Sequence, residues 1–200
     1  MPTTLTMIKQ PQGAFARQIR LLRTQLLAIH PGQVIQFAPL TPSADLTPLV
    51  ANLAVALANI QQRVLLIDLQ LQQPRLQDYF SVDPVGIADY LAQHNSLKLT
   101  TFTPKPTLTL LGAGRSAQPT ADLLGTPQFD QLIQQFRLHY DLVLLLTPPL
   151  PTTADAQIIA PSSDGVILTV AANTKKRALT DTLDCLKTLQ VPVIGSVYLT

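Results

Sequence analysis

Apolar residues along this chain fall into short runs separated by stretches with a helical repeat. The runs lack a regular polar alternation and occupy residues 34–38, 64–69, 107–111, 141–147, 165–171 and 193–199. Continuous apolar runs of this length are typical of strands covered on both faces. Helical patterns lie between and before them, at residues 14–29, 48–60, 75–80, 86–93, 127–139, 153–160 and 175–190. The alternation predicts βαβ units, and hence a Rossmann-like α/β fold with a mostly parallel sheet of about six or seven strands.

The first predicted helix, residues 14–29, is amphipathic. Its apolar positions recur at helical spacing and form one stripe, which consists of Phe15, Ile19, Leu22 and Leu26. Residues 1–13 carry no such repeat and are predicted to be a flexible arm, and residues 94–106 are predicted to be an exposed loop. No linker or internal repeat interrupts the pattern, so residues 1–200 are expected to form a single domain.

The composition is that of a folded protein with a nearly neutral surface. Apolar residues make up 46% and charged residues 13%, which excludes the disordered class. With 14 basic and 12 acidic residues, the net charge of +2 is too balanced to indicate a nucleic-acid partner. The lone cysteine, Cys185, cannot form an internal disulfide, and no apolar run approaches the roughly 18 residues of a membrane-spanning helix. These features, and a start that does not resemble a signal peptide, predict a cytoplasmic location.

Ligands of open parallel sheets bind beyond the carboxyl ends of the strands. Four segments are predicted to converge there: 39–47, 68–75, 112–120 and 147–154. The first joins a strand to a helix, the place where phosphate-binding loops have the form G-x-x-x-x-G-K-[ST]. Residues 39–48 instead read PLTPSADLTP, with no glycine to turn backbone N–H groups inward and no lysine to reach a phosphate. The frame of a nucleotide-binding loop is present without its phosphate chemistry.

The residues that remain in this loop are suited to starting a helix. Thr47 is predicted to cap it, with Pro48 at its first position. Asp45 is expected just before the helix N-terminus, where the helix dipole favours a carboxylate. One hypothesis is that Asp45 occupies the place of a phosphate or repels anions from it, and the alternative is an ordinary capped loop. Both interpretations argue against tight ATP binding.

Two other strand ends bear on metal chemistry. Asp68 ends a buried strand in the expected crevice, where it either is linked to Mg²⁺ or caps the next turn. Leu146 stands near the end of residues 141–147, where a phosphate hydrolase usually has an acidic residue that holds the metal through water. Asp141 opens that strand at the opposite end and cannot replace it.

Several segments, taken in order, resemble the bacterial tyrosine kinases of capsule and exopolysaccharide synthesis, relatives of the ParA/MinD-type ATPases. The resemblance runs from about residue 14 to the end and is carried by VANLAVALANIQQRVLLID (50–68), LQQPRLQDYF (71–80), GIADYL (86–91), LGAGRSAQPTADLLGTPQFDQLI (111–133), YDLVLLLTPP (140–149), DGVILTVAANTKKRAL (164–179) and VPVIGSVYL (191–199). It implies a three-layer sandwich of the P-loop NTPase type.

The departures from the family's motifs predict a loss of activity. The family's Gly-x-Gly-Lys-Ser-Thr loop falls on residues 43–48, so that Ser43 and Asp45 stand for its glycines, Leu46 for its lysine and Thr47 for its Mg²⁺-binding hydroxyl. In the family's Asp-x-Asp motif, Asp68 matches and Gln70 replaces the second aspartate. Ser43, Asp45, Thr47 and Asp68 are therefore interpreted as a vestigial nucleotide site, with no cofactor expected. The tyrosine-rich tail of active members has no counterpart before Thr200.

The resemblance implies an inactive homologue that acts by binding in polysaccharide synthesis and chain-length control. The expected partner is a membrane-anchored chain-length adaptor, which would bring the chain to the inner face of the cell membrane, or an active kinase paralogue. One alternative is an active tyrosine kinase or ATPase that binds ATP and Mg²⁺ at a non-standard site. Another is a ParA/MinD-like scaffold protein.

The first helix carries a further candidate for partner binding. The family's Glu-x-x-Arg-x-x-Arg pattern, used for ring assembly, reads Arg17, Arg20 and Arg23 here. The two final arginines match, but Arg17 replaces the glutamate, which puts a homo-oligomeric ring in doubt and leaves a hetero-oligomer open. These arginines are predicted to point away from the apolar stripe and to bind an acidic partner or anionic lipid, or else to form a solvated helix face.

Overall fold

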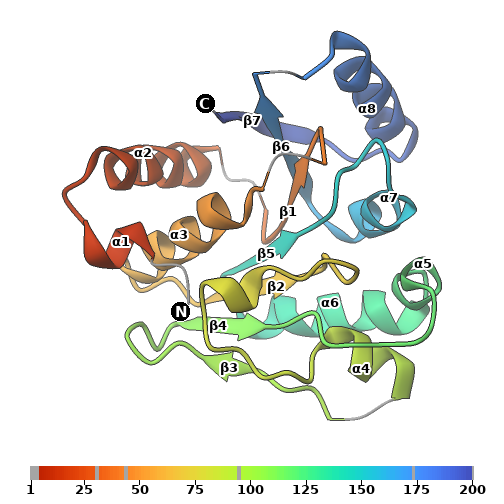
Figure 1. The fold of residues 1–200 in the computed structure, drawn as a ribbon, viewed down its shortest axis with the longest axis horizontal. Coiled ribbons are helices and arrows are strands. Elements are labelled where there is room, and N and C mark those ends of the chain that lie inside the picture. The colour runs from red at the N-terminus through yellow and green to blue at the C-terminus, as the bar shows by residue number, and fades with distance from the viewer. Residues whose placement is uncertain (1–4, 30–31, 43–44, 94–95, 173, 200) are drawn as a thin grey trace.

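Figure 1 shows the fold in a computed structural model. It describes residues 5–29, 32–42, 45–93, 96–172 and 174–199. Ser43, one of the predicted site residues, lies outside the described residues. No helix in the described part of the chain is both long enough and apolar enough to cross a membrane.

Seven strands form one sheet, with the order β3-β4-β2-β5-β1-β6-β7. The strands are β1 (Val34–Pro39), β2 (Val64–Asp68), β3 (Thr100–Thr101), β4 (Leu108–Leu111), β5 (Leu142–Leu146), β6 (Gly165–Ala171) and β7 (Val193–Leu199). All neighbours pair in parallel except β3 and β4, which are antiparallel. The prediction of a mostly parallel sheet is confirmed, and the order places β5 at its centre, between β2 and β1.

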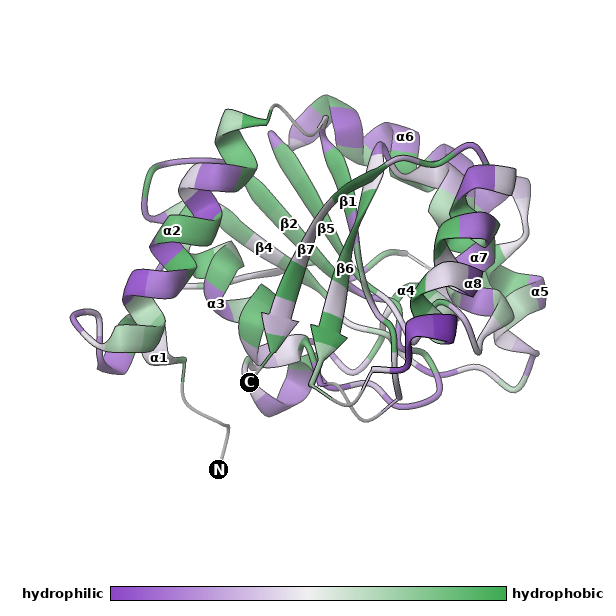
Figure 2. Cartoon of the chain, turned by 90° about the horizontal axis from the view of Figure 1, so that it is seen from above, coloured by the Kyte–Doolittle hydropathy of each residue, from purple (hydrophilic) through white to green (hydrophobic). Residues whose placement is uncertain are grey.

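Helices cover both faces of the sheet, which gives three layers (Figures 1 and 2). One face carries α1 (Thr6–Lys9), α2 (Ala14–Ala28) and α3 (Thr47–Ala58). The other carries α4 (Ile87–Gln93), α5 (Thr120–Leu124), α6 (Pro127–His139), α7 (Ala154–Ile159) and α8 (Lys176–Thr188). Short 3₁₀ turns, η1 (Leu76–Asp78) and η2 (Ala160–Ser162), follow β2 and α7.

The central strands divide their side chains between these two layers. In β5, Leu142, Leu144 and Leu146 pack in the cluster of α2 and α3, while Val143 and Leu145 pack in the cluster of α4, α5 and α6. The alternation explains why β5 is apolar at every position, because both of its faces are buried. The strands therefore end in a rigid core that holds the loops beyond them.

The N-terminal segment, parts of two loops and the burial of one strand differ from the sequence-based expectations. Residues 5–13 are not a loose arm, since Leu5 and Met7 are each 4% exposed and α1 packs against α3. Thr100–Thr101 adds a short strand inside the predicted loop 94–106, and α5 forms where no helix was predicted. At the sheet edge β7 is only half-covered, so its apolar run does not reflect burial on both faces.

Candidate functional site

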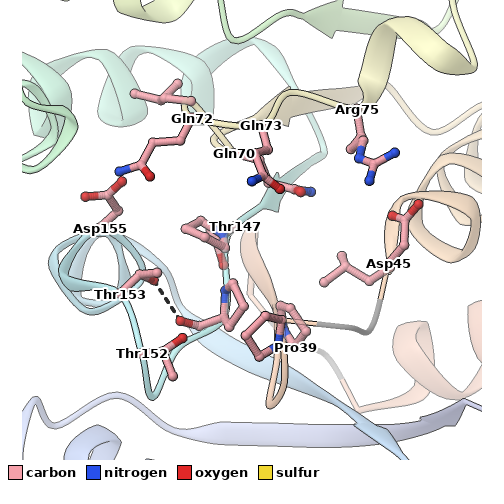
Figure 3. A pocket seen from close by; sticks show the side chains of 15 residues that line it. Pro39, Asp45, Gln70, Gln72, Gln73, Arg75, Thr147, Thr152, Thr153 and Asp155 are labelled. Atoms are coloured by element: carbon pink, nitrogen blue, oxygen red, sulfur yellow. Dashed lines mark hydrogen bonds between the residues drawn. The ribbon is translucent and has the colours of Figure 1, made fainter.

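The loops after β1, β2 and β5 enclose a cavity of about 220 Å³ at the carboxyl end of the sheet (Figure 3). Its lining comes from residues 39–46, 70–75 and 147–155. Three of the four predicted segments therefore converge. The fourth, residues 112–120, does not line the cavity and reaches its border only at Thr120, whose hydroxyl donates to Asp155 Oδ2 at 2.6 Å.

Asp45 lies at the N-terminus of α3 and closes the first turn of that helix. Its Oδ1 accepts a hydrogen bond from the backbone N–H of Thr47 at 2.9 Å. The helix begins one residue earlier than predicted, so Thr47 is its first residue rather than its cap, and Pro48 is its second. The capping contact comes from Asp45 because Leu46, at the cap position, has no side-chain acceptor.

The side chains of Leu46 and Thr47 offer no polar group to a ligand of the cavity, although Leu46 lines it. Leu46 is 1% exposed and packs in the apolar cluster of α2 and α3. Thr47 is fully buried, and its Oγ1 has no hydrogen-bond partner among the described residues. It is also not part of the cavity lining. Of the predicted vestigial nucleotide site, three residues are described by the structure (Asp45, Thr47 and Asp68), and among these only Asp45 lines the cavity.

Asp68 is fully buried and holds the loop that follows β2. Its Oδ1 accepts the backbone N–H of Gln70 at 3.0 Å, and its Oδ2 accepts those of Arg75 and Leu76, each at 2.9 Å. Burial raises the pKa of the Asp68 carboxyl above its ordinary value, and the negative charge of the neighbouring Asp45 adds to this effect. The three N–H donors lower the pKa, but they offset the effect of burial only in part. The geometry corresponds to the capping alternative, in which the carboxylate is committed to backbone donors.

Charged groups around the cavity are few and nearly balanced. Asp45 and Asp155 carry negative charge and Arg75 positive charge, and glutamines, threonines and prolines supply most of the remaining lining. Asp155, in the first turn of α7, is 6% exposed, whereas the Arg75 side chain is 50% exposed. Among the described residues, no three His, Cys, Asp or Glu side chains lie close enough to hold a metal ion.

The end of β5 is polar at Thr147 and apolar at Leu146. Leu146 is fully buried and pairs in register with Asp68. The Thr147 hydroxyl donates to the Phe37 carbonyl at 3.0 Å and accepts from the Gln36 side chain at 3.1 Å. Asp141, at the far end of β5, binds Arg63 at 2.6 Å, and this hydrogen bond lowers the pKa of its carboxyl. The expectation that Asp141 cannot serve the crevice is confirmed.

Asp155, Arg75 and Thr147 were not singled out from the sequence. Asp155 and Thr147 lie at loop or helix positions of the TPPLPTTADA stretch, where an aspartate in a first helical turn is ordinary. Their convergence depends on the placement of β5 between β1 and β2, which the order of segments along the chain does not specify. The signal that the sequence did offer for these residues was the number of polar side chains in the loops 70–75 and 147–155, both of which were expected at the crevice.

The three arginines of α2 contact backbone carbonyls of this chain. Arg17 donates to the carbonyl of Gln12 at 2.8 Å, and Arg20 to that of Pro11 at 2.6 Å. Arg23 is half-buried and donates to the carbonyl of Ala56 in α3 at 3.0 Å. Arg23 therefore faces α3, whereas Arg17 and Arg20 bind carbonyls at the surface.

Several known proteins are similar to this chain in both amino-acid sequence and fold. Tyrosine-protein kinase YwqD of Bacillus subtilis is 26% identical over 203 residues, which cover 98% of this chain and 86% of that protein. The BceF tyrosine kinase domain superposes with a TM-score of 0.88 and 26% identity, over 98% of this chain and 82% of that one. The chain is a homologue of the bacterial tyrosine kinases of capsule and exopolysaccharide synthesis. No protein-family model matches it.

Longer members of this kinase group also align, but over a limited part of their length. Tyrosine-protein kinase ptk of Acinetobacter johnsonii is 31% identical over 189 residues, which are 90% of this chain and 26% of that protein. Succinoglycan biosynthesis transport protein ExoP of Rhizobium meliloti is 28% identical, over 95% of this chain and 25% of that protein. The chain thus spans about a quarter of the length of these two relatives.

More distant structures agree in fold alone. The septum site-determining protein MinD of Pyrococcus horikoshii, complexed with Mg-ADP, superposes with a TM-score of 0.66 and 21% identity, over 83% of this chain and 69% of that one. The predicted resemblance to the tyrosine kinases and the P-loop NTPase-type fold are both confirmed.

Proposed function

We propose that this chain is a catalytically inactive homologue of the polysaccharide-synthesis tyrosine kinases and acts by binding. The observation that carries the proposal is the N-terminus of α3. There the Asp45 carboxylate accepts a hydrogen bond from the backbone N–H of Thr47. Leu46, at the position of the lysine in the kinase motif, packs into the apolar core. A phosphate would have to displace a carboxylate that is both hydrogen-bonded and favoured by the helix dipole.

The rest of the crevice offers little to replace this loss. Phosphoryl transfer depends on positioned cations, because charge accumulates on the transferred group. Arg75 is the cation in the described lining of the cavity, and two carboxylates, those of Asp45 and Asp155, oppose it there. The Thr47 hydroxyl is buried away from the cavity, and Asp68 is committed to three backbone donors. These features favour a state without bound ATP or Mg²⁺.

The proposed role is regulatory, in polysaccharide synthesis and chain-length control. Relatives whose names place them in exopolysaccharide transport or tyrosine phosphorylation support this pathway. The proposed partner is a membrane-anchored chain-length adaptor or an active kinase paralogue, which would bring a cytoplasmic chain to the inner face of the membrane. A hetero-oligomer is favoured over a homo-ring because Arg17 stands where the family's ring-assembly pattern has a glutamate, so that a second copy of this chain would bring arginine against arginine.

Isothermal titration calorimetry with Mg-ATP and Mg-ADP tests the inactive state. We expect no saturable binding heat at nucleotide concentrations up to about 1 mM. A dissociation constant of about 1 mM would correspond to a binding free energy of only about 4 kcal/mol. Arg75→Gln provides the matched variant, because it removes the exposed cation of the cavity without touching a buried contact. Micromolar binding by the natural sequence that Arg75→Gln weakens would establish a non-standard nucleotide site and overturn the proposal.

A further inference from the structure

Asn52 is a polar residue in the middle of an otherwise apolar helix. Helix α3 reads TPLVANLAVALA, and Asn52 is 2% exposed within it. Its Oδ1 accepts the backbone N–H of Met7 at 2.8 Å, and its Nδ2 donates to the carbonyl of Pro48 at 2.7 Å. A buried amide costs free energy unless its donors and acceptors are paired, and here both ends are paired. The side chain therefore joins the N-terminal segment to the first turn of α3.

The N-terminal segment, residues 5–13, is attached to the domain at a small number of points. Leu5 and Met7 are its buried apolar side chains, each 4% exposed in the cluster of α2 and α3. Near its other end, Arg17 and Arg20 donate to the carbonyls of Gln12 and Pro11 at the surface. Helix α1 has four residues and is too short to be stable alone. Opening this segment exposes far less apolar surface than unfolding the domain.

The contacts of Asn52 lead directly to the loop at the cavity. Pro48 follows Thr47, and the Thr47 N–H binds the Asp45 carboxylate that lines the cavity. A shift of the N-terminal segment removes the Met7 partner of Asn52 and leaves a buried acceptor unpaired. Asn52 must then take water or another protein group as its partner, and a reorientation of the amide toward either disturbs its bond to Pro48 at the start of α3.

We propose that residues 5–13 form a displaceable strap, and that Asn52 couples this strap to the end of the loop that carries Asp45 and leads into α3. A partner that binds the strap would loosen the loop at the cavity, and a ligand of the cavity would change the exposure of the strap by the same coupling free energy. Asn52 acts here as a positioning residue. The coupling concerns the loop discussed under the proposed function but does not depend on it, because it holds whether or not the cavity binds nucleotide.

Hydrogen exchange followed by mass spectrometry tests the coupling in a double-mutant cycle. The variant L5A/M7A removes the buried side chains that hold the strap, and it retains the backbone N–H of residue 7 that binds Asn52. We expect faster exchange in peptides covering residues 5–13, and about threefold or faster exchange in those covering 45–52. When Asn52→Ala is also present, opening the strap should no longer speed exchange in residues 45–52. Asn59→Ala, at the exposed end of the same helix, is the matched control and should leave the effect intact.

Two results would overturn the proposal. One is faster exchange of the strap with no change in residues 45–52, and the other is an undiminished change in 45–52 when Asn52 is alanine. If L5A/M7A unfolds the domain as a whole, exchange of the natural sequence in low urea replaces it. A shared opening free energy and urea dependence for residues 5–13 and 45–52 supports the coupling, and separate values contradict it.

Discussion

The carboxylate of Asp45 accepts the backbone N–H of Thr47 at 2.9 Å and so closes the first turn of α3 from within the chain. The first N–H groups of a helix have no intrahelical acceptor, and phosphate-binding loops use such groups to hold their ligand. Here one of these donors is satisfied by a negatively charged side chain. The same interaction stabilises the helix and opposes an incoming anion.

Asp45→Ala should lower the free energy of unfolding by about 1 kcal/mol, because the Thr47 N–H loses its acceptor. Asp45→Ser should retain most of that stability, since a serine hydroxyl accepts from the same position. Urea denaturation monitored by circular dichroism measures both. Asp122→Ala removes an exposed carboxylate from the first turn of α5 and serves as the control, with an expected change within about 0.5 kcal/mol. Equal losses for Asp45→Ala and Asp122→Ala would show that Asp45 is not a cap.

The parallel sheet could be predicted from the sequence because its signal is local. Each of the runs 165–171 and 193–199 matches a strand of the structure at both ends. The small pieces could not: α1 is held by Leu5 and Met7 against a helix more than 40 residues away, and β3 exists through its pairing with β4. Contacts distant in sequence decide such elements, and no periodicity reports them.

The candidate site shows the same division. The loop 39–48 was placed correctly from the strand before it and the helix after it, and three of the four segments expected at the crevice line the cavity. Whether Asp68 faced a ligand or the backbone could not be predicted, because its three donors come from residues 70, 75 and 76 of a folded loop. Asn52 could have been noticed as the single amide in an apolar helix, but its partner Met7 could not.

Asp68→Asn should lower the free energy of unfolding by about 1–3 kcal/mol, as expected for the loss of charge-assisted hydrogen bonds at a buried site. The amide of asparagine has one oxygen acceptor where the carboxylate uses two, so an N–H of Gln70, Arg75 or Leu76 is left without its partner. Chemical denaturation measures the loss, and Asp78→Asn is the control. Asp78 pairs with Arg75 at 3.8 Å at the surface and should contribute less than about 1 kcal/mol. Equal effects would refute a structural role for Asp68.

Gly114→Ala should destabilise the fold by about 1–3 kcal/mol or more, because Gly114 has a φ of +71° that disfavours other residues. A Cβ there would also clash with Asp89 Oδ2, which accepts hydrogen bonds from the backbone N–H groups of Gly86 and Arg115. Thermal unfolding measures the effect. Gly195→Ala in β7 is the matched control, since its Cβ meets nothing within 4 Å. A Gly114→Ala protein as stable as Gly195→Ala would contradict the tight turn.

Arg137→Met should weaken the dependence of stability on pH in the acid range. Arg137 binds both oxygens of Asp164, at 2.7 and 2.8 Å, and the N–H groups of Gln33 and Val34 bind Asp164 as well. Burial alone would raise the pKa of the Asp164 carboxyl, but these donors hold it below its ordinary value. A lowered pKa in the folded state means that the stabilisation is complete above the unfolded pKa of about 4. It is lost as the pH falls through the folded pKa.

Urea denaturation between about pH 2 and pH 7 should therefore show a shallower acid loss of stability in Arg137→Met than in the natural sequence. At pH 7 the variant should be less stable by about 1–3 kcal/mol, because a partly buried carboxylate loses its charged partner. Arg177→Met is the control, since its contact with Asp181 is exposed and 3.6 Å long. An unchanged acid slope in Arg137→Met would show that Asp164 does not set the pH dependence, and the link between β1 and the start of β6 would then contribute through packing rather than charge.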